Sequence, residues 1–179
     1  KLIKNGNTGY FAYFVAGTIL SQTKKDEAIP LLKKSLSLKE SSRVYAQLGF
    51  CYDGSRDDLA ILYYEKAVDP NIKNYDENEI TLANLGLCYK YLKEYETALK
   101  YFDRAIEILP EYTSAIGSKL ETLGILGRFD ELISTCNESL HKNSPKMEDE
   151  DIIDFLERKR DALFELDRLD DALECSNEI

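Results

Sequence analysis

Apolar residues recur at helical spacing in the middle of the chain, between residues 79 and 112. Gaps of three and four residues return to the same side of an α-helix, so one apolar face is formed by three residues: Leu82, Leu85 and Tyr89. A second face of the same kind follows a short turn at residues 93–95: Ala98, Phe102 and Ala105. Gly86 has no side chain and would let the second helix approach closely. The pattern therefore predicts two helices packed against each other.

The same residues form a known repeat pattern. The segment reads Leu82-x2-Leu85-Gly86-x2-Tyr89, then Ala98-x3-Phe102, Ala105 and Pro110. It resembles the tetratricopeptide (TPR) repeat, with Leu82 where that family carries Trp. The resemblance implies an all-α fold, a right-handed α-α superhelix or solenoid of antiparallel helix pairs. It also implies a protein that binds other proteins rather than one that catalyses a reaction.

Further copies of the pattern extend along the chain at intervals that scatter around the family period of about 34 residues. Equivalents of Ala98 are Ala28, Ala60, Leu132 and Ala172. We predict a single TPR-like solenoid over residues 1–179 with five units: 9–41, 42–72, 79–112, 113–146 and a truncated 148–179. In the first unit we place Ala16 at the close-packing position of Gly86, and Leu32 at that of Phe102. A helical hairpin cannot bury its apolar face alone, so the units are expected to stack.

Helix ends are marked by proline and by short polar residues. Asp76 and Glu79 form a predicted capping pair ahead of the third unit. Pro30 falls inside a predicted helix, and we expect it in the first turn, where proline is tolerated. The acidic run 148–151 predicts a helix N-terminus, with contact to a cation or a basic peptide as the alternative. Surface loops are expected at 70–78 and 142–151.

The charge balance limits the partners. Asp and Glu number 33 against 23 Lys and Arg, a net charge of −10. Clustered positive charge is needed to bind nucleic acid or anionic lipid, so we expect neither as a partner. A protein or peptide with apolar and neutral-to-basic segments suits this field better. The most apolar stretch, 10–20, is too short to span a membrane, and it lacks the features of a signal peptide.

The four cysteines, Cys51, Cys88, Cys136 and Cys175, form no Cys-x-x-Cys pair. Cys51 and Cys88 each precede the tyrosine of their motif, which predicts small buried core residues, with a disulfide framework or a zinc site as alternatives. A reducing compartment follows, and we expect a cytoplasmic protein. Because the chain lacks an initial Met, we expect it to be a fragment from which a targeting signal could be missing.

Residues with catalytic patterns are few. His141 is the only histidine, and its place near a predicted helix end favours a structural role. The sequence has no phosphate-binding loop, HExxH motif or nucleophile elbow. We therefore predict no enzyme activity, no metal site and no cofactor.

The predicted functional surface is the concave groove that first helices line in the resembled family. Its N-terminal half is apolar and aromatic, whereas its C-terminal half is polar and acidic. Aromatic residues make good interface anchors, and amides can bind a peptide backbone. The candidate peptide-binding residues are Tyr10, Tyr13, Gln47, Phe50, Ile80, Asn84, Leu87 and Tyr91. For the aromatic members, packing against a neighbouring helix is the alternative.

Some members of the family grip the C-terminal carboxylate of heat-shock chaperones with Lys, Arg and Asn from three units. Starting in the first unit, the matching places hold Tyr13, Gly17, Gln47, Ile80 and Asn84. No window assembles the positive charge that a buried carboxylate needs. We therefore expect a protein-interaction scaffold or adaptor without this carboxylate clamp.

Two other functions stay open at the level of the sequence. The chain could be a regulatory part of a larger, multidomain protein with an enzymatic domain elsewhere. It could also self-associate through an apolar face left by the truncated last unit, formed by Phe155, Leu163, Leu166 and Leu173.

Overall fold

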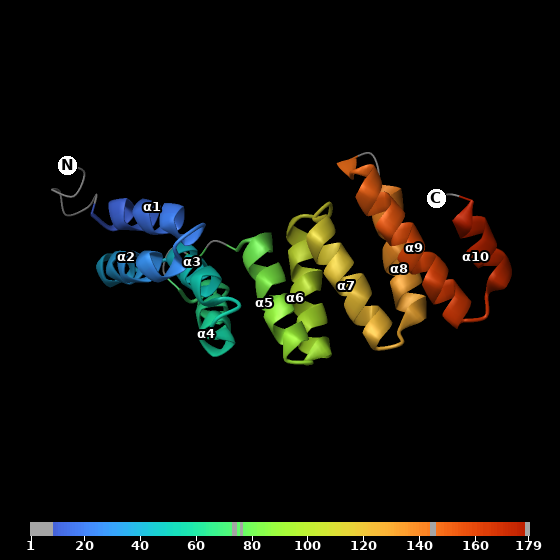
Figure 1. The fold of residues 1–179 in the computed structure, drawn as a ribbon, viewed down its shortest axis with the longest axis horizontal. Coiled ribbons are helices and arrows are strands. Elements are labelled where there is room, and N and C mark those ends of the chain that lie inside the picture. The colour runs from blue at the N-terminus through green and yellow to red at the C-terminus, as the bar shows by residue number, and fades with distance from the viewer. Residues whose placement is uncertain (1–8, 73–74, 76, 144–145, 178–179) are drawn as a thin grey trace. The chain divides into compact units, whose positions relative to one another are not determined.

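A computed structural model describes residues 9–72, 75, 77–143 and 146–177, except for the side chain of Asn143. These residues form ten α-helices and no strand (Figure 1). The predicted all-α fold class is confirmed. The helices are α1 Gly9–Ser21, α2 Lys25–Leu38, α3 Ser42–Tyr52, α4 Asp57–Ala67, α5 Glu79–Tyr91, α6 Tyr95–Ile108, α7 Thr113–Ile125, α8 Phe129–Asn143, α9 Asp149–Glu165 and α10 Leu169–Ser176.

The chain divides into two compact units, Lys1–Cys88 and Tyr89–Ile179. In the first unit, α1 pairs with α2 and α3 pairs with α4, while α2 also packs on α3 (Figure 1). Every second-helix position predicted to pack inward is buried there, including Ala28, Leu32 and Ala60. Partly buried aromatic residues, among them Phe14, Tyr52 and Tyr63, close the core of the first two hairpins.

The second unit contains the hairpins α7/α8 and α9/α10, with α6 packed on α7 and α8 on α9. Its core is one cluster that runs from Leu99 to Cys175. Phe155 and Leu163, which we expected on an exposed apolar face, are each 1% exposed within this core. Leu166 is partly buried, and Leu173 alone of that predicted set is largely exposed. The predicted self-association face is therefore wrong for Phe155 and Leu163, because both lie on α9 and pack into a core that includes residues of α7, α8 and α10.

Glycine sets the helix register in the first unit. A Cβ atom on Gly49 would lie 2.5 Å from Cδ1 of Tyr64, and one on Gly17 would lie 2.7 Å from Cγ of Leu32. Gly17, not Ala16, is therefore the close-packing residue of the first hairpin. The expected register was wrong by one residue, which rotates the face of α1 by about 100°.

Three expectations about helix ends have clear outcomes. Pro30 lies inside α2, in the second turn rather than the first, because the helix begins at Lys25. Asp76 lies outside the described residues; the Asn78 side chain caps α5 instead, its Oδ1 accepting from the Thr81 backbone N–H at 3.1 Å. The acidic run is confirmed as a helix N-terminus, because α9 begins at Asp149 with three acids in its first turn.

The described residues include no helix with the length and apolar character needed to cross a lipid bilayer.

All four cysteines are free and buried, which confirms the burial predicted from the motif positions of Cys51 and Cys88. Burial raises the pKa of Cys136 to about 12. The pKa of Cys88 also rises to about 12, first through burial and then through the nearby carboxylates of Asp53 and Asp57. These thiols stay protonated at neutral pH and act as small apolar core residues.

We expect Gly49→Ala to lower the free energy of unfolding by about 1 to 3 kcal/mol, because the new methyl group collides with the buried Tyr64 ring. Gly117→Ala in α7 is the matched control, since its Cβ would meet Phe155 only at 3.9 Å. There the better helix propensity of alanine should stabilise by about 0.5 to 1 kcal/mol. Urea unfolding followed by circular dichroism measures both, and equal effects of the two substitutions would contradict the close contact.

A second prediction concerns the thiols. A pKa of about 12 against an ordinary 9.0 lowers the thiolate fraction of Cys88 and Cys136 by about a thousandfold near pH 8. Because all four cysteines are also buried, we expect each of them to react with Ellman's reagent far more slowly in the native protein than in guanidinium chloride. A thiol that reacts at the same rate in both solutions would show that it is not buried.

Candidate functional site

A cavity of about 460 Å³ lies in the first unit and is lined mainly by α3 and α5, with α1 and α4 at its sides. Most of its lining residues are apolar or carry amides, and Arg43 is the one charged member of the lining set. The lining residues are Phe14, Gln22, Ser42, Arg43, Ala46, Gln47, Phe50, Tyr64, Ala67, Asn78, Ile80, Thr81 and Asn84. Its volume is within the usual range for a ligand site.

Two side-chain amides occupy equivalent places in this cavity. Gln47 lies two residues before Gly49 on α3, and Asn84 lies two residues before Gly86 on α5. The equal spacing between amide and glycine in the two repeats thus places one amide from each helix against the same cavity. Both amides are only partly buried, so each retains hydrogen-bonding capacity towards a ligand.

Hydrogen bonds within the protein orient the two amides in opposite senses. The Ser21 hydroxyl lies 2.8 Å from the Thr18 carbonyl and 3.2 Å from Oε1 of Gln47, and its hydrogen is shared between these oxygens. This holds the carbonyl end of Gln47 and leaves its NH2 group for a ligand. Asn84 instead donates from Nδ2 to the Tyr64 hydroxyl at 3.4 Å, which leaves its carbonyl oxygen. These two amides therefore offer the cavity a donor from Gln47 and an acceptor from Asn84.

Tyr64 links the amides to the fold. Its side chain is 1% exposed, and its ring covers the backbone of Gly49. Burial raises the pKa of Tyr64 far above its ordinary value, with a further contribution from the Asp53 carboxylate. The hydroxyl thus remains protonated and fixed, and it holds the Asn84 side chain by accepting its hydrogen bond.

The Phe50 ring forms one wall of the cavity, and Lys25 restricts its position. Lys25 Nζ lies 4.7 Å from the centre of the Phe50 ring and donates to the backbone carbonyl of Asp53 at 3.1 Å. Burial raises the pKa of the Asp53 carboxyl, while the charge of Lys25 opposes that rise. A cation on the ring face is favourable, so it fixes the Phe50 ring at the edge of the cavity.

The cavity brings together four of the eight residues that the sequence predicted: Gln47, Phe50, Ile80 and Asn84. Tyr10 lines a neighbouring cavity instead. Tyr13 and Leu87 are partly buried, Tyr91 is 71% exposed, and none of the three lines either cavity.

The register of α1 explains which lining residues sequence reasoning missed. With Gly17 at the close-packing place, the cavity is lined by Phe14 of α1 and by Gln22, which directly follows this helix, rather than by Tyr10 and Tyr13. The signal was present in the sequence, because Gly17 precedes Ala28 by the same interval as Gly49 precedes Ala60. Tyr64 and Ala67 were missed for another reason, since the prediction considered first helices only.

The described first-helix faces of the second unit carry ion pairs. Lys90 binds Glu121 at 2.9 Å with only 10% of its side chain exposed, and Arg158 binds Asp154 at 2.8 Å. The hydrogen bond from Arg158 to Asp154 raises the pKa of the guanidinium, and the charge of Glu121 adds to the rise. These cations are already neutralised by neighbouring carboxylates.

Charge is divided unequally between the two units. Acidic and basic residues are equal in number through Cys88, so the whole net charge of −10 falls on residues 89–179. Within the described residues, no three potential ligands among His, Cys, Asp and Glu are grouped closely enough to hold a metal ion. The larger cavity of the first unit gathers the amide and aromatic side chains described above and is the candidate functional site.

Comparison with known proteins finds one repeat family and several solved structures with the same fold. Residues 80–112 match the tetratricopeptide repeat family. Anaphase-promoting complex subunit 6 of Dictyostelium discoideum is 36% identical over 62 residues. That match spans 35% of this chain and only 7% of the relative.

Solved TPR structures share the fold at low sequence identity. YrrB, described as a TPR protein with an unusual peptide-binding site, superposes with a TM-score of 0.72 at 21% identity, over 91% of this chain and 80% of its own. MamA gives a TM-score of 0.75 at 18% identity, over 94% and 88%. PilF of Pseudomonas aeruginosa gives 0.72 at 19% identity, over 97% and 76%.

The matched repeat over residues 80–112 and the shared fold make the chain similar to tetratricopeptide repeat proteins. Proteins with this repeat are generally non-enzymatic scaffolds, and the match over residues 80–112 supports a role in protein–protein interaction.

Proposed function

We propose that the cavity between α3 and α5 binds an extended peptide segment of a partner protein. The observation that carries the proposal is the pair of oppositely oriented amides on Gln47 and Asn84. A peptide unit presents one C=O acceptor and one N–H donor, which these amides can satisfy together. Burying a peptide unit is costly unless both groups find partners, so the pair favours backbone over an apolar small molecule.

The cavity walls supply the side-chain contacts in this proposal. Phe14, Phe50 and Ile80 offer apolar surface, and Ile80 is 50% exposed before any partner binds. Apolar and neutral side chains of the partner would lie here. The net negative charge, all of which falls on residues 89–179, suits a partner with neutral-to-basic segments. Tyr13, Leu87 and Tyr91 remain predicted contacts.

The proposal does not include the chaperone carboxylate clamp. With the register set by Gly17, the first-unit places that the clamp would use hold Phe14 and Thr18, and neither side chain is cationic. A buried terminal carboxylate would lack the charge-assisted hydrogen bonds that it needs there. As an interaction scaffold with cysteines in its core, the protein would suit the reducing cytoplasm.

Replacing both amides by an apolar residue of similar size tests the proposed function. We expect the parent protein to select peptides from a random 12-residue phage-displayed library. Gln47→Leu/Asn84→Leu should bind the selected peptides about tenfold to a hundredfold more weakly, because two backbone hydrogen bonds are lost. Fluorescence anisotropy with synthetic copies of these peptides measures the dissociation constants.

The matched control is Asn137→Leu, the same kind of change on an exposed surface of α8 outside the cavity. It should leave the affinity unchanged, and circular dichroism confirms that each variant is folded. If the amide variant binds as tightly as the parent, the proposed site is wrong.

The lack of a carboxylate clamp gives a separate prediction. Amidation of the C-terminus of a selected peptide should leave its dissociation constant unchanged, since the cavity holds an internal segment. A tenfold or larger loss on amidation would show instead that the free terminal carboxylate is the recognised group.

A further inference from the structure

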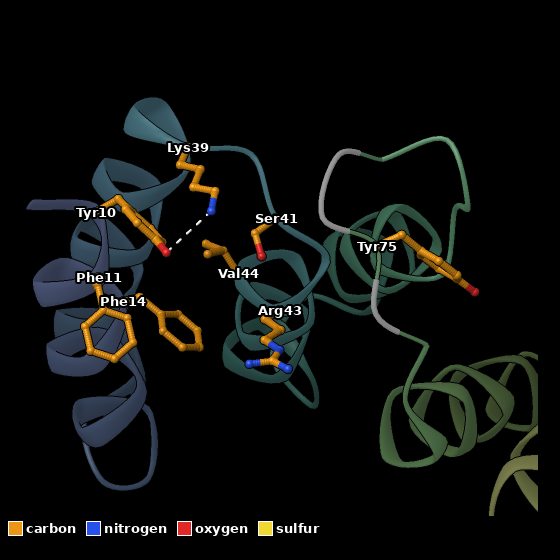
Figure 2. A pocket seen from close by; sticks show the side chains of 8 residues that line it. All are labelled: Tyr10, Phe11, Phe14, Lys39, Ser41, Arg43, Val44 and Tyr75. Atoms are coloured by element: carbon orange, nitrogen blue, oxygen red, sulfur yellow. Dashed lines mark hydrogen bonds between the residues drawn. The ribbon is translucent and has the colours of Figure 1, made fainter. Parts of the chain in front are cut away.

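A second cavity lies beside the larger one in the first unit. It has a volume of about 320 Å³, and Phe14 and Arg43 line both cavities. Figure 2 shows the rings of Phe11 and Phe14 on the α1 side of it, and Val44, near the start of α3, on the other. Its volume is at the small end of the usual range for a ligand site, which suits one large side chain rather than a longer segment.

Three aromatic rings line the α1 side of this cavity. The ring centres of Tyr10 and Phe11 lie 6.4 Å apart, and those of Phe11 and Phe14 lie 6.5 Å apart. Val44, a core residue that is 2% exposed, supplies apolar surface opposite them, whereas Phe11 is 57% exposed. Ring pairs at such distances are favourable beyond the apolar area that they bury, so the exposed Phe11 ring can take a further aromatic partner.

The charged residues at and beside this cavity already have partners within the protein. Lys39 Nζ lies 4.7 Å from the centre of the Tyr10 ring and donates to the Tyr10 hydroxyl at 3.5 Å. Glu40, in the same connection between α2 and α3, accepts from the Tyr45 hydroxyl at 2.8 Å. Arg43 also interacts with another group of the protein. A charged ligand side chain would have to replace such contacts or be buried without a partner, whereas an uncharged ring displaces none of them.

We propose that the second cavity holds an aromatic side chain, Phe, Tyr or Trp, of the same partner peptide whose backbone binds Gln47 and Asn84. The proposal rests on the proposed function and deepens it, because the walls shared at Phe14 and Arg43 let one bound segment extend from the larger cavity into the smaller one. The recognised segment is then a backbone-bound stretch with an aromatic anchor beside it.

Changing the anchor of the peptide tests its chemistry. Library-selected peptides should share an aromatic residue at one position, and synthetic versions carry Phe, cyclohexylalanine or Ala there. Cyclohexylalanine keeps the apolar bulk of Phe without an aromatic ring. For the parent protein we expect Ala to weaken binding about tenfold to a hundredfold and cyclohexylalanine about twofold to tenfold, measured by fluorescence anisotropy. Equal or tighter binding of the cyclohexylalanine peptide, or no shared aromatic position, would overturn the aromatic specificity.

A double-mutant cycle tests whether the ring binds in this cavity. Phe11→Ala should weaken the Phe peptide about threefold to tenfold and leave the affinity for the Ala peptide unchanged. Ile19→Ala is the matched control, because Ile19 is also exposed on α1, at 67%, but lies outside both cavities. It should leave both affinities unchanged, and circular dichroism checks that each variant is folded. Equal effects of Phe11→Ala on the two peptides would overturn the assignment to this cavity.

Failure of this inference can be distinguished from failure of the proposed function. Gln47→Leu/Asn84→Leu should weaken the Phe and Ala peptides alike, since it removes backbone hydrogen bonds, whereas Phe11→Ala should act on the Phe peptide alone. If the amide variant weakens both peptides and Phe11→Ala weakens neither, the aromatic anchor is wrong and peptide binding stands. If the parent selects no peptide at all, the proposed function fails, and this inference fails with it.

Discussion

The contact between a glycine on one helix and a large side chain on the next is the constraint on which the first unit depends. Tyr64 packs so closely over Gly49 that a single methyl group would not fit, and Leu32 packs over Gly17 in the same way. This contact fixes the rotation of both helices in a hairpin. It therefore decides which side chains enter the core and which face the cavity.

The contact between Gly49 and Tyr64 also determines how one amide of the site is oriented. Because Tyr64 is held against Gly49, its buried hydroxyl meets Asn84 of α5 and turns that amide. Gln47 is turned in the other sense by Ser21, the last residue of α1. Recognition of a peptide backbone would thus rest on the packing of three hairpins rather than on one exposed residue.

Much of this arrangement could be predicted from sequence, and the exceptions have physical causes. The periodicity around Leu82 and Phe102 correctly predicted helices, and the spacing correctly placed Gln47 and Asn84 on one surface. Tyr10 lies outside the larger cavity, contrary to the prediction, because the helix register of the first unit was predicted wrongly by one residue. That unit lacks most of the motif, and a shift of one residue rotates a helix face by about 100°.

The side-chain amide signals of Gln47 and Asn84 in a nitrogen–proton correlation spectrum test the central claim most directly. Titration with a library-selected peptide should shift both signals, in proportion to the bound fraction, while the amide signal of Asn137 on α8 stays in place. If the peptide binds but the Gln47 and Asn84 signals do not move, the peptide lies elsewhere on the protein, and the account of the cavity is contradicted.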